Sequence, residues 1–188
     1  DFVRAKTTYD QGVDQMFDLP GARPVAFRMP CCDSMNSVSP RFFTEIFGKT
    51  TPRGHFLHMD SSVFVLQTPD DPSLPKELIA NQEGKSRFDK YVPRDRGFIN
   101  YVQNYPYPYV IARLCWEMPS SIPDDWQGHN LQKPHHPVTI ADMKAAIDSV
   151  AAKQGIYVLT HDAGAWIRND QVIELIDHAV GRHGKKVM

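Results

Sequence analysis

The sequence predicts an α/β fold, part of a distorted barrel of parallel strands and helices whose N-terminal strands are missing from these 188 residues. Two observations predict it. Short apolar runs alternate with helical patterns along the chain, as in parallel sheets flanked by helices. The chain also opens on a helical pattern and closes on a strand-like one, and each needs a neighbour to pack against. We therefore expect residues 1–188 to form a segment of a larger α/β barrel, completed by the remainder of the same barrel.

The composition is that of an ordinary globular domain. Hydrophobic residues make up 41% of the chain and charged residues 23%, which is enough apolar material for a core. The net charge of −1 gives no general attraction to nucleic acid, and no apolar run is long enough to span a bilayer. The first residue is Asp1, so we expect a processed or partial product; cytoplasmic and exported locations both agree with the sequence.

The first elements alternate between helix and strand. Apolar residues recur at helical spacing over residues 1–17. An apolar run predicts a strand over residues 24–29. A Ser-Pro pair, typical of a helix start, opens a helix over residues 39–48 that ends at a glycine. Strands are expected at 55–60, with a short continuation at 63–66.

A long irregular insertion follows at about residues 67–108. It is rich in proline, glycine and charged residues and contains no long periodic segment. Ordinary connections are much shorter, so we expect an ordered insertion with little regular structure. Its aromatic and basic residues could stack on sugar rings or a partner protein, or could pack as the small core of a lid. The near-neutral net charge disfavours nucleic acid as the partner.

The rest of the chain returns to the alternating pattern. Residues 109–116 predict one strand, and a helix over 139–155 is expected to start with a threonine cap. Residues 156–160 are nearly all apolar, as in a buried parallel strand. A last helix is expected at 170–183, followed by a strand stub at 185–188. The predicted apolar face of the helix at 170–183 consists of Ile173, Ile176 and Val180.

Two residues at predicted strand ends are the main candidates for chemistry. Arg28 could hold a carboxylate through two parallel hydrogen bonds, and His161 could act as a general acid or base. Polar residues at the C-terminal ends of parallel strands are typical of α/β active sites, so we expect both to face one site. The alternative is that both are structural residues at the rim of the barrel.

Other polar clusters carry weaker signals. The His-x-x-His spacing at residues 55–58 falls on a predicted strand, where the two rings point to opposite faces, so shared metal binding is not expected. The pair His135–His136 lies in a proline-flanked loop, and Asp124–Asp125 is typical of a solvated turn. The cysteines have no zinc-binding spacing and are expected to be reduced thiols, with a cysteine nucleophile as the lesser alternative.

At Arg28-Met29-Pro30 and Leu159-Thr160-His161 the chain resembles the polysaccharide deacetylase (NodB-homology) family. The longer segments at residues 27–36 and 105–111 resemble a bacterial subgroup of this family. The resemblance implies a distorted barrel of strands and helices, of which residues 1–188 are the C-terminal portion. It also implies a hydrolase of carbohydrate metabolism that removes acetyl groups from N-acetylated sugars with a divalent metal, Zn²⁺.

The resemblance also implies roles for single residues. Arg28 resembles the arginine that orients the carboxylate base, and His161 resembles the general acid that protonates the leaving amine. Asp125, in an Asp-Trp pair, resembles the carboxylate that orients the late histidine, although Trp116–Glu117 competes for that place. We expect three aromatic side chains to contact the carbohydrate substrate: Trp116, Tyr107 and Trp166.

The family's Thr-Phe-Asp-Asp-Gly and His-x-x-x-His motifs do not occur in this sequence. The metal ligands and the base are therefore not expected among these residues, and we expect the chain alone to be inactive. Two other functions remain open. The chain could be a non-catalytic carbohydrate-binding or interaction module on the same scaffold. It could also belong to an amidase of the superfamily that acts on a small non-sugar amide.

Overall fold

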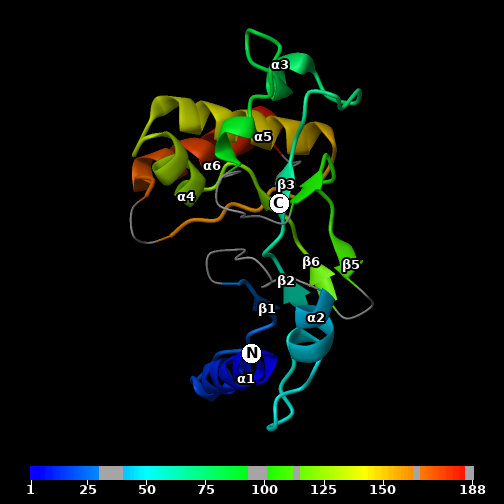
Figure 1. The fold of residues 1–188 in the computed structure, drawn as a ribbon. Helices are drawn as coiled ribbons and strands as arrows, with labels where there is room; N and C mark the ends of the chain where they lie inside the picture. Colours follow the sequence, from blue (N-terminus) through cyan, green and yellow to red (C-terminus); the bar gives the residue numbers. More distant parts are fainter. Residues whose placement is uncertain (30–39, 93–100, 112–114, 163–165, 185–188) are drawn as a thin grey trace. The chain divides into compact units, whose positions relative to one another are not determined.

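The computed structural model describes residues 1–29, 40–92, 101–111, 115–162 and 166–184. They form a mixed α/β fold in which most strand pairs are parallel, which confirms the predicted class. The chain divides into two compact units (Figure 1). The first unit comprises Asp1–Val63 and Pro108–Met118, and the second comprises Phe64–Tyr107 and Pro119–Met188. Each unit has its own sheet and is described by itself.

The sheet of the first unit has four short strands in the order β1-β2-β6-β5. They are β1 (Ala26–Phe27), β2 (Met59–Asp60), β6 (Cys115–Glu117) and β5 (Tyr109–Ile111). The first three are parallel, and β5 runs antiparallel to β6. Polar side chains at the C-terminal ends of β2 and β6 therefore lie side by side, because parallel strands end at the same edge of a sheet.

Two helical segments supply the core of the first unit. The helix α1 (Phe2–Asp18) begins at Asp1, whose carboxylate accepts a hydrogen bond from the Val3 amide at 2.9 Å. The helix α2 (Pro40–Phe42) continues directly as the π-helix η1 (Phe43–Phe47). Their apolar side chains form one cluster with α1: Val13, Phe42, Phe43, Ile46, Phe47, Leu57 and Cys115. The predicted helices at 1–17 and 39–48 are thus confirmed within the described residues.

The sheet of the second unit has three parallel strands. The fully buried strand β3 (Phe64–Leu66) lies between β4 (Tyr101–Gln103) and β7 (Ser120–Ser121). The sequence suggested that residues 63–66 continue the preceding strand, whereas β3 is the central strand of a separate sheet. The central place of β3 explains why all three of its side chains are apolar.

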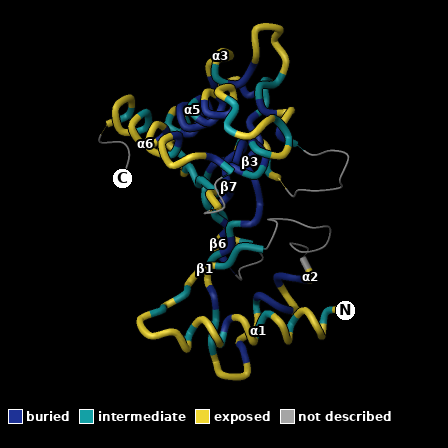
Figure 2. Tube along the Cα trace, turned by 90° about the vertical axis from the view of Figure 1, so that its left-hand side faces the viewer, coloured by how far each residue is buried: buried dark blue, intermediate teal, exposed yellow. Residues whose placement is uncertain are grey.

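Two long helices pack together in the second unit. These are α5 (Pro137–Ala152) and α6 (Asn169–His183) (Figure 1). Their shared core contains Ile140, Met143, Ile147, Ile167 and Leu175. Figure 2 shows α5 as mostly buried, in agreement with the ten buried residues along it. Burial on nearly every side makes α5 the central helix of this unit.

The insertion at 67–108 is ordered over its described part and is anchored on α5. It contains the short helix α3 (Lys76–Ile79), the 3₁₀-helix η2 (Asp89–Tyr91) and the strand β4. Phe88 and Tyr91 are fully buried, so these aromatic residues pack inside the unit and cannot stack on a sugar ring. These elements are only three or four residues long, and β4 adds an edge to the sheet.

Asp142 of α5 provides the anchor for this insertion. Its carboxylate lies 3.0 Å from Nη1 of Arg87 and 2.6 Å from Nζ of Lys90, and it accepts a hydrogen bond from the Tyr91 hydroxyl at 2.8 Å. Burial and the neighbouring Asp142 charge raise the pKa of Tyr91, so its hydroxyl remains a donor. One buried carboxylate therefore holds three side chains from a segment about fifty residues away.

The predicted strand at 109–116 is wrong, because two antiparallel strands, β5 and β6, occupy this region. A short apolar run does not distinguish one strand from two that pair with each other. The predicted strands at 24–29 and 55–60 are confirmed only as the two-residue strands β1 and β2. Beyond those residues, single hydrogen bonds replace the ladder; the His58 amide, for example, donates to the Val25 carbonyl at 2.9 Å.

The predicted strand at 156–160 is also wrong. The segment has no strand assignment and is partly exposed, although its main chain is tied to neighbours. The Ile156 amide donates to the Pro106 carbonyl at 2.8 Å, and the Val158 carbonyl accepts from the Ser121 amide at 2.9 Å. Gly155 is required at the approach to Pro106, because a Cβ there would lie 2.5 Å from the Pro106 oxygen. The segment is thus extended but joins no ladder.

Two details of the long helices differ from the predictions. The cap of α5 is His136, whose Nδ1 accepts from the Val138 amide at 3.1 Å, while Thr139 is buried inside the helix. On α6, each residue of the predicted apolar face is more than half exposed, whereas Leu175 is buried. Both helices have apolar residues on more than one face, so periodicity alone chose the wrong side of α6. The predicted Ser39 cap and the stub at 185–188 lie outside the described residues.

Replacing Asp142 should loosen the insertion. In Asp142→Ala, two cations and the buried Tyr91 hydroxyl lose their shared partner, so we expect the free energy of unfolding to fall by about 3–5 kcal/mol. Urea denaturation followed by circular dichroism measures this. Asp170→Ala is the control, because Asp170 forms an exposed pair with Arg168 in the same unit and should change stability little. Equal losses in the two variants would contradict the anchoring role of Asp142.

Candidate functional site

A buried carboxylate and a partly exposed histidine meet in the second unit. Asp125 is the first residue of α4 (Asp125–Gln127), which continues as the π-helix η4 (Gly128–Gln132). A capping box fixes its start: Asp124 accepts from the Gln127 amide at 2.7 Å, and Gln127 Oε1 accepts from the Asp124 amide at 2.9 Å. The sequence pattern suggested a solvated turn here, but both aspartates are buried.

Backbone amides hold the Asp125 carboxylate in place. Its Oδ1 accepts from the Trp126 amide at 2.8 Å, and its Oδ2 accepts from the Asp162 amide. Oδ2 also lies 3.6 Å from Nδ1 of His161, which is beyond a hydrogen bond but within ion-pair distance. The His161 side chain is 29% exposed, whereas Asp125 is fully buried.

This arrangement is suited to proton transfer. A fixed carboxylate beside Nδ1 favours the proton on that nitrogen and leaves Nε2 to exchange protons with a bound molecule. The partly exposed ring can meet such a molecule, and the buried carboxylate cannot. The pair therefore has the geometry of a general acid or base with an orienting carboxylate.

The structure divides the other predicted site residues between the two units. Arg28 and Trp116 belong to the first unit, and Tyr107, Trp166 and His161 belong to the second. That Arg28 and His161 face one site therefore stays a prediction. Within the first unit, burial raises the pKa of Glu117, and the Arg28 charge offsets a small part of that rise.

The three predicted aromatic contacts differ in their availability. Trp116 on β6 is 49% exposed, which leaves a ring face open to a ligand. The Tyr107 hydroxyl is already engaged, since it donates to the Lys153 carbonyl at 2.5 Å. Trp166 is half-buried, with its ring centroid 6.2 Å from that of His129. Trp116 is thus the best placed of the three for stacking on a sugar ring.

A buried carboxyl pair at the ends of β2 and β6 was not predicted from the sequence. Asp60 and Glu117 are opposite each other in the sheet register, and both are fully buried. Asp60 accepts from the Ser62 hydroxyl at 2.9 Å and the Ser62 amide at 3.0 Å, and Glu117 Oε1 accepts from the Val63 amide at 3.2 Å. In the sequence alone, both residues look like ordinary acidic residues at the ends of strands. Only the parallel register of β2 and β6 places them side by side.

Glu117 is neutral at pH 7 in this pair. Burial, followed by the hydrogen bond to Asp60 and its charge, raises the pKa of Glu117 to about 9. Two adjacent buried carboxylates cannot both ionise at low cost, so a proton is retained between them. Buried Oε2 of Glu117 receives no donor from the described residues, which fits a proton on this oxygen.

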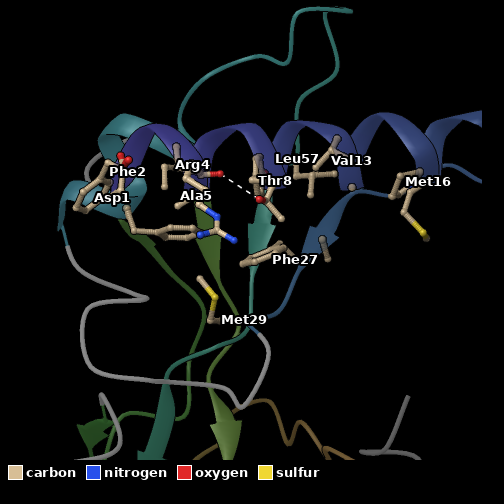
Figure 3. A pocket seen from close by; sticks show the side chains of 16 residues that line it. Asp1, Phe2, Arg4, Ala5, Thr8, Val13, Met16, Phe27, Met29 and Leu57 are labelled. Carbon is tan, nitrogen blue, oxygen red and sulfur yellow. Dashed lines mark hydrogen bonds between the residues drawn. The ribbon is translucent and has the colours of Figure 1, made fainter.

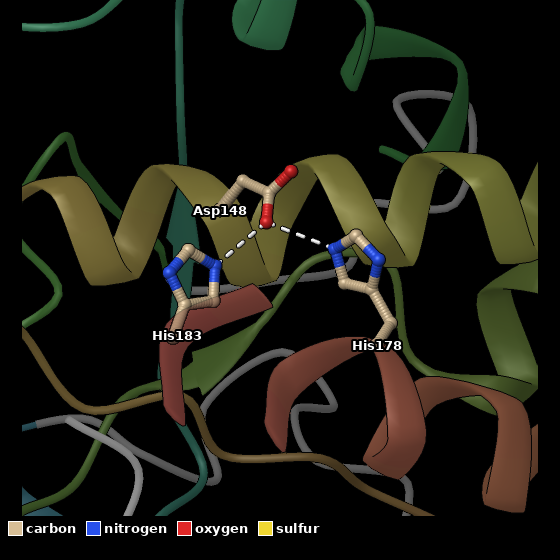
Figure 4. A group of neighbouring side chains, drawn as sticks. All are labelled: Asp148, His178 and His183. Atoms are coloured by element: carbon tan, nitrogen blue, oxygen red, sulfur yellow. Dashed lines mark hydrogen bonds and ion pairs between the residues drawn. The ribbon is translucent and has the colours of Figure 1, made fainter. Parts of the chain in front are cut away.

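A second unpredicted group could hold a metal ion. Asp148 of α5 and two histidines of α6, His178 and His183, lie together in the second unit (Figure 4). Their potential ligand atoms lie within 4.8 Å of one another. Four residues separate the two histidines, a spacing that also occurs among zinc ligands, but no cysteine pair accompanies them and Asp148 is thirty residues away along the chain. The sequence therefore carried no sufficient signal for it.

Other polar candidates have structural partners. Nδ1 of His55 lies 2.7 Å from Asp14 Oδ1, and its ring stacks on Phe17 at 4.0 Å. Burial raises the pKa of the Cys115 thiol to about 12, so this residue is not a reactive thiolate. Cys31 and Cys32 lie outside the described residues.

The first unit also contains a hollow of about 820 Å³ between α1 and β1. Figure 3 shows Ala5, Phe27 and Met29 among the side chains that line it. The lining is mainly apolar, with charged residues at one end of α1. Such a surface can accept an apolar group, but it does not bring together a set of polar residues suited to catalysis.

Comparison of the chain with models of known protein families, with curated protein sequences and with solved structures finds no match. Among the described residues, no helix combines the length and the apolar character needed to cross a bilayer. A function for this chain is therefore inferred from its sequence and from the geometry of the sites described above.

The retained proton of Glu117 should make stability depend on pH. The folded state binds this proton more tightly than the unfolded chain, whose ordinary pKa is 4.5. Its stabilising effect is thus complete below about pH 4.5 and is lost as pH rises to about 9. Glu117→Gln keeps a neutral donor at every pH. We expect it to be more stable than the natural protein by about 1–3 kcal/mol at pH 9 and similar at pH 4.5.

Urea denaturation of both proteins between pH 4.5 and 9 checks this difference. Comparing the two proteins at each pH cancels the titration of all other groups. Glu117→Ala is the control, because it removes the donor and leaves a cavity, and it should be less stable throughout. Curves for Glu117→Gln and the natural protein that stay parallel would show that Glu117 is ionised at neutral pH.

Proposed function

We propose that this chain is part of a polysaccharide deacetylase-like hydrolase, built as a distorted barrel, that removes acetyl groups from N-acetylated sugars. The observation that carries the proposal is the pair formed by His161 and buried Asp125. The resemblance of the sequence to that family assigns these two residues the roles of general acid and orienting carboxylate. Their 3.6 Å separation and the two amides that fix Asp125 support those roles.

His161 donates the proton that the leaving amine requires. An amine is expelled from an acetamide only when it is protonated, and a histidine near neutral pH is suited to donate that proton. Asp125 keeps the ring oriented. In this proposal Arg28 orients the carboxylate of the base.

The catalytic metal implied by the resemblance, Zn²⁺, would activate water and stabilise the charge on the acetyl oxygen. An aspartate and two histidines are the ligands that this family uses. Asp148, His178 and His183 match these residue types, but they come from two helices rather than from the family's two motifs. We therefore do not assign the catalytic metal to them.

Substrates with different leaving groups test the role of His161. In an active protein that contains this chain, His161→Ala should lower acetate release from N-acetylglucosamine oligomers by about 10²–10⁴-fold. The same variant should lose much less activity on 4-nitrophenyl acetate, whose leaving group needs no proton. Asp125→Asn should lower acetamide hydrolysis by about 10–100-fold. Zinc content is measured alongside and should not change.

Equal losses on both substrates would show that His161 does not act as the acid. A loss of zinc in His161→Ala would instead place this residue among the metal ligands. Full activity of Asp125→Asn would exclude an orienting role for that carboxylate. The three outcomes therefore separate the acid, the orienting residue and the metal site.

A second candidate function is carbohydrate binding without catalysis. The observation that favours it is the exposed ring of Trp116, because sugar-binding surfaces use open aromatic faces for stacking. The near-neutral charge also agrees with an uncharged ligand rather than nucleic acid. In this case Trp116 contributes much of the binding free energy, and His161 is not needed for binding.

Titration calorimetry with N-acetylglucosamine oligomers separates the two candidates. For a binding module, Trp116→Ala should weaken affinity about tenfold through lost stacking and apolar contact. His161→Ala should leave affinity unchanged and serves as the control. Binding that is lost in His161→Ala but kept in Trp116→Ala would contradict the binding-module function.

A further inference from the structure

We propose that Asp148, His178 and His183 bind one transition-metal ion, Zn²⁺, and that this ion joins α5 to α6. The site is separate from the catalytic metal implied by the family resemblance, and it does not depend on the proposed hydrolase activity. It rests on the positions and chemistry of these three side chains.

The three side chains converge from two helices. Asp148 extends from α5 toward α6, where the rings of His178 and His183 face it (Figure 4). Nε2 of His178 lies 2.9 Å from Asp148 Oδ1, and Nε2 of His183 lies 2.8 Å from the same oxygen. The two rings are nearly perpendicular, with an interplanar angle of 80° and centroids 6.4 Å apart. They therefore approach the carboxylate from different directions, as metal ligands do.

These donor atoms suit a borderline-soft cation. Zn²⁺ binds imidazole nitrogen and carboxylate oxygen at about 2.0–2.2 Å in tetrahedral geometry. Ligand atoms around such an ion are about 3.4 Å apart by that geometry. The donor atoms here already lie within 4.8 Å of one another, so side-chain rotations can bring them onto one ion. Three protein ligands leave the fourth position for water.

The surroundings allow an ion to enter. The side chains of Asp148, His178 and His183 are 10%, 18% and 16% exposed, so the group is shielded but reachable from solvent. It lies beside the apolar contact of α5 with α6, which holds the two helices in register without the ion. The ligands are thus positioned before binding, and this lowers the entropic cost of forming the site.

Each imidazole must present an unprotonated Nε2 to the ion. In the ion-free arrangement both Nε2 atoms contact one carboxylate oxygen, so each carries a hydrogen. Binding requires the neutral rings to carry that hydrogen on Nδ1 instead. The exchange through solvent is fast and releases no net proton from a neutral ring. Acidic conditions, which charge the rings, should therefore oppose binding.

Arg182 is the neighbour that opposes a cation. Its Nε lies 3.3 Å from Asp148 Oδ2, and its side chain is 60% exposed. The guanidinium places a positive charge beside the site, but its exposure allows it to swing into solvent. Removing this charge should strengthen metal binding, whereas a purely structural Asp148–histidine cluster would gain nothing from its removal.

Calorimetry with Zn²⁺ and visible absorption with Co²⁺ test the site, using protein without a polyhistidine tag. We expect one equivalent to bind, with a visible Co²⁺ band typical of four-coordinate nitrogen and oxygen ligands. Mg²⁺ and Ca²⁺ should not compete, because they prefer all-oxygen sites. Saturating Zn²⁺ should raise the melting temperature by about 5 °C. Asp148→Asn should weaken Zn²⁺ binding at least tenfold, and Arg182→Gln should tighten it severalfold.

His55→Gln is the matched control, because it removes an Asp–His contact of the first unit and should leave metal binding unchanged. If Asp148→Asn does not fold, His178→Gln decides the test, since the contact of His183 with Asp148 remains in it. Zn²⁺ affinity that is unchanged in the folded variant overturns the proposal. Absence of a Co²⁺ band in the natural protein also overturns it.

Discussion

Short strands are the constraint on which this structure depends. Each described strand has two or three residues, so its hydrogen-bond ladder contributes few bonds to joining distant segments. Buried carboxylates supply the missing connections. Asp60 and Glu117 meet where β2 and β6 end, Asp125 receives the amide of residue 162, and Asp142 holds the insertion on α5. Side-chain hydrogen bonds and ion pairs thus join distant segments that longer strands join in other sheets.

A buried carboxylate is stable only when its charge is removed or compensated, and this chain uses three solutions. Glu117 retains a proton because it is buried and because Asp60 lies beside it. Asp125 accepts two backbone amides and lies within ion-pair distance of His161. Asp142 is paired with two cations and a hydroxyl. The choice decides what each group can do, since a protonated or fully paired carboxyl has little capacity left for a ligand.

The sequence predicted the helices better than the strands, for a physical reason. The helices α1, α5 and α6 span four turns or more, so their apolar periodicity is visible and their extents agree with the predictions. Strands β1 and β2 have too few residues for any period to appear. Asp125 looked like part of a solvated turn because a second carboxylate, Asp124, precedes it. Its burial depends on the residue 162 amide, 37 positions away, which no local pattern reveals.

Structural carboxylates differ from those suited to function in whether a ligand can reach them. Asp142 and the Asp60–Glu117 pair are enclosed by partners that complete their hydrogen bonding or retain a proton, so a ligand would have to break the fold to reach them. Asp125 and Asp148 differ, because each lies beside a partly exposed histidine that a ligand can reach from solvent. A buried, fixed carboxylate behind a reachable imidazole can orient a proton donor or support a metal ligand. Both candidate sites of the second unit therefore combine a buried carboxylate with a more exposed imidazole. Backbone amides fix the carboxylate of Asp125, whereas two histidines contact the carboxylate of Asp148.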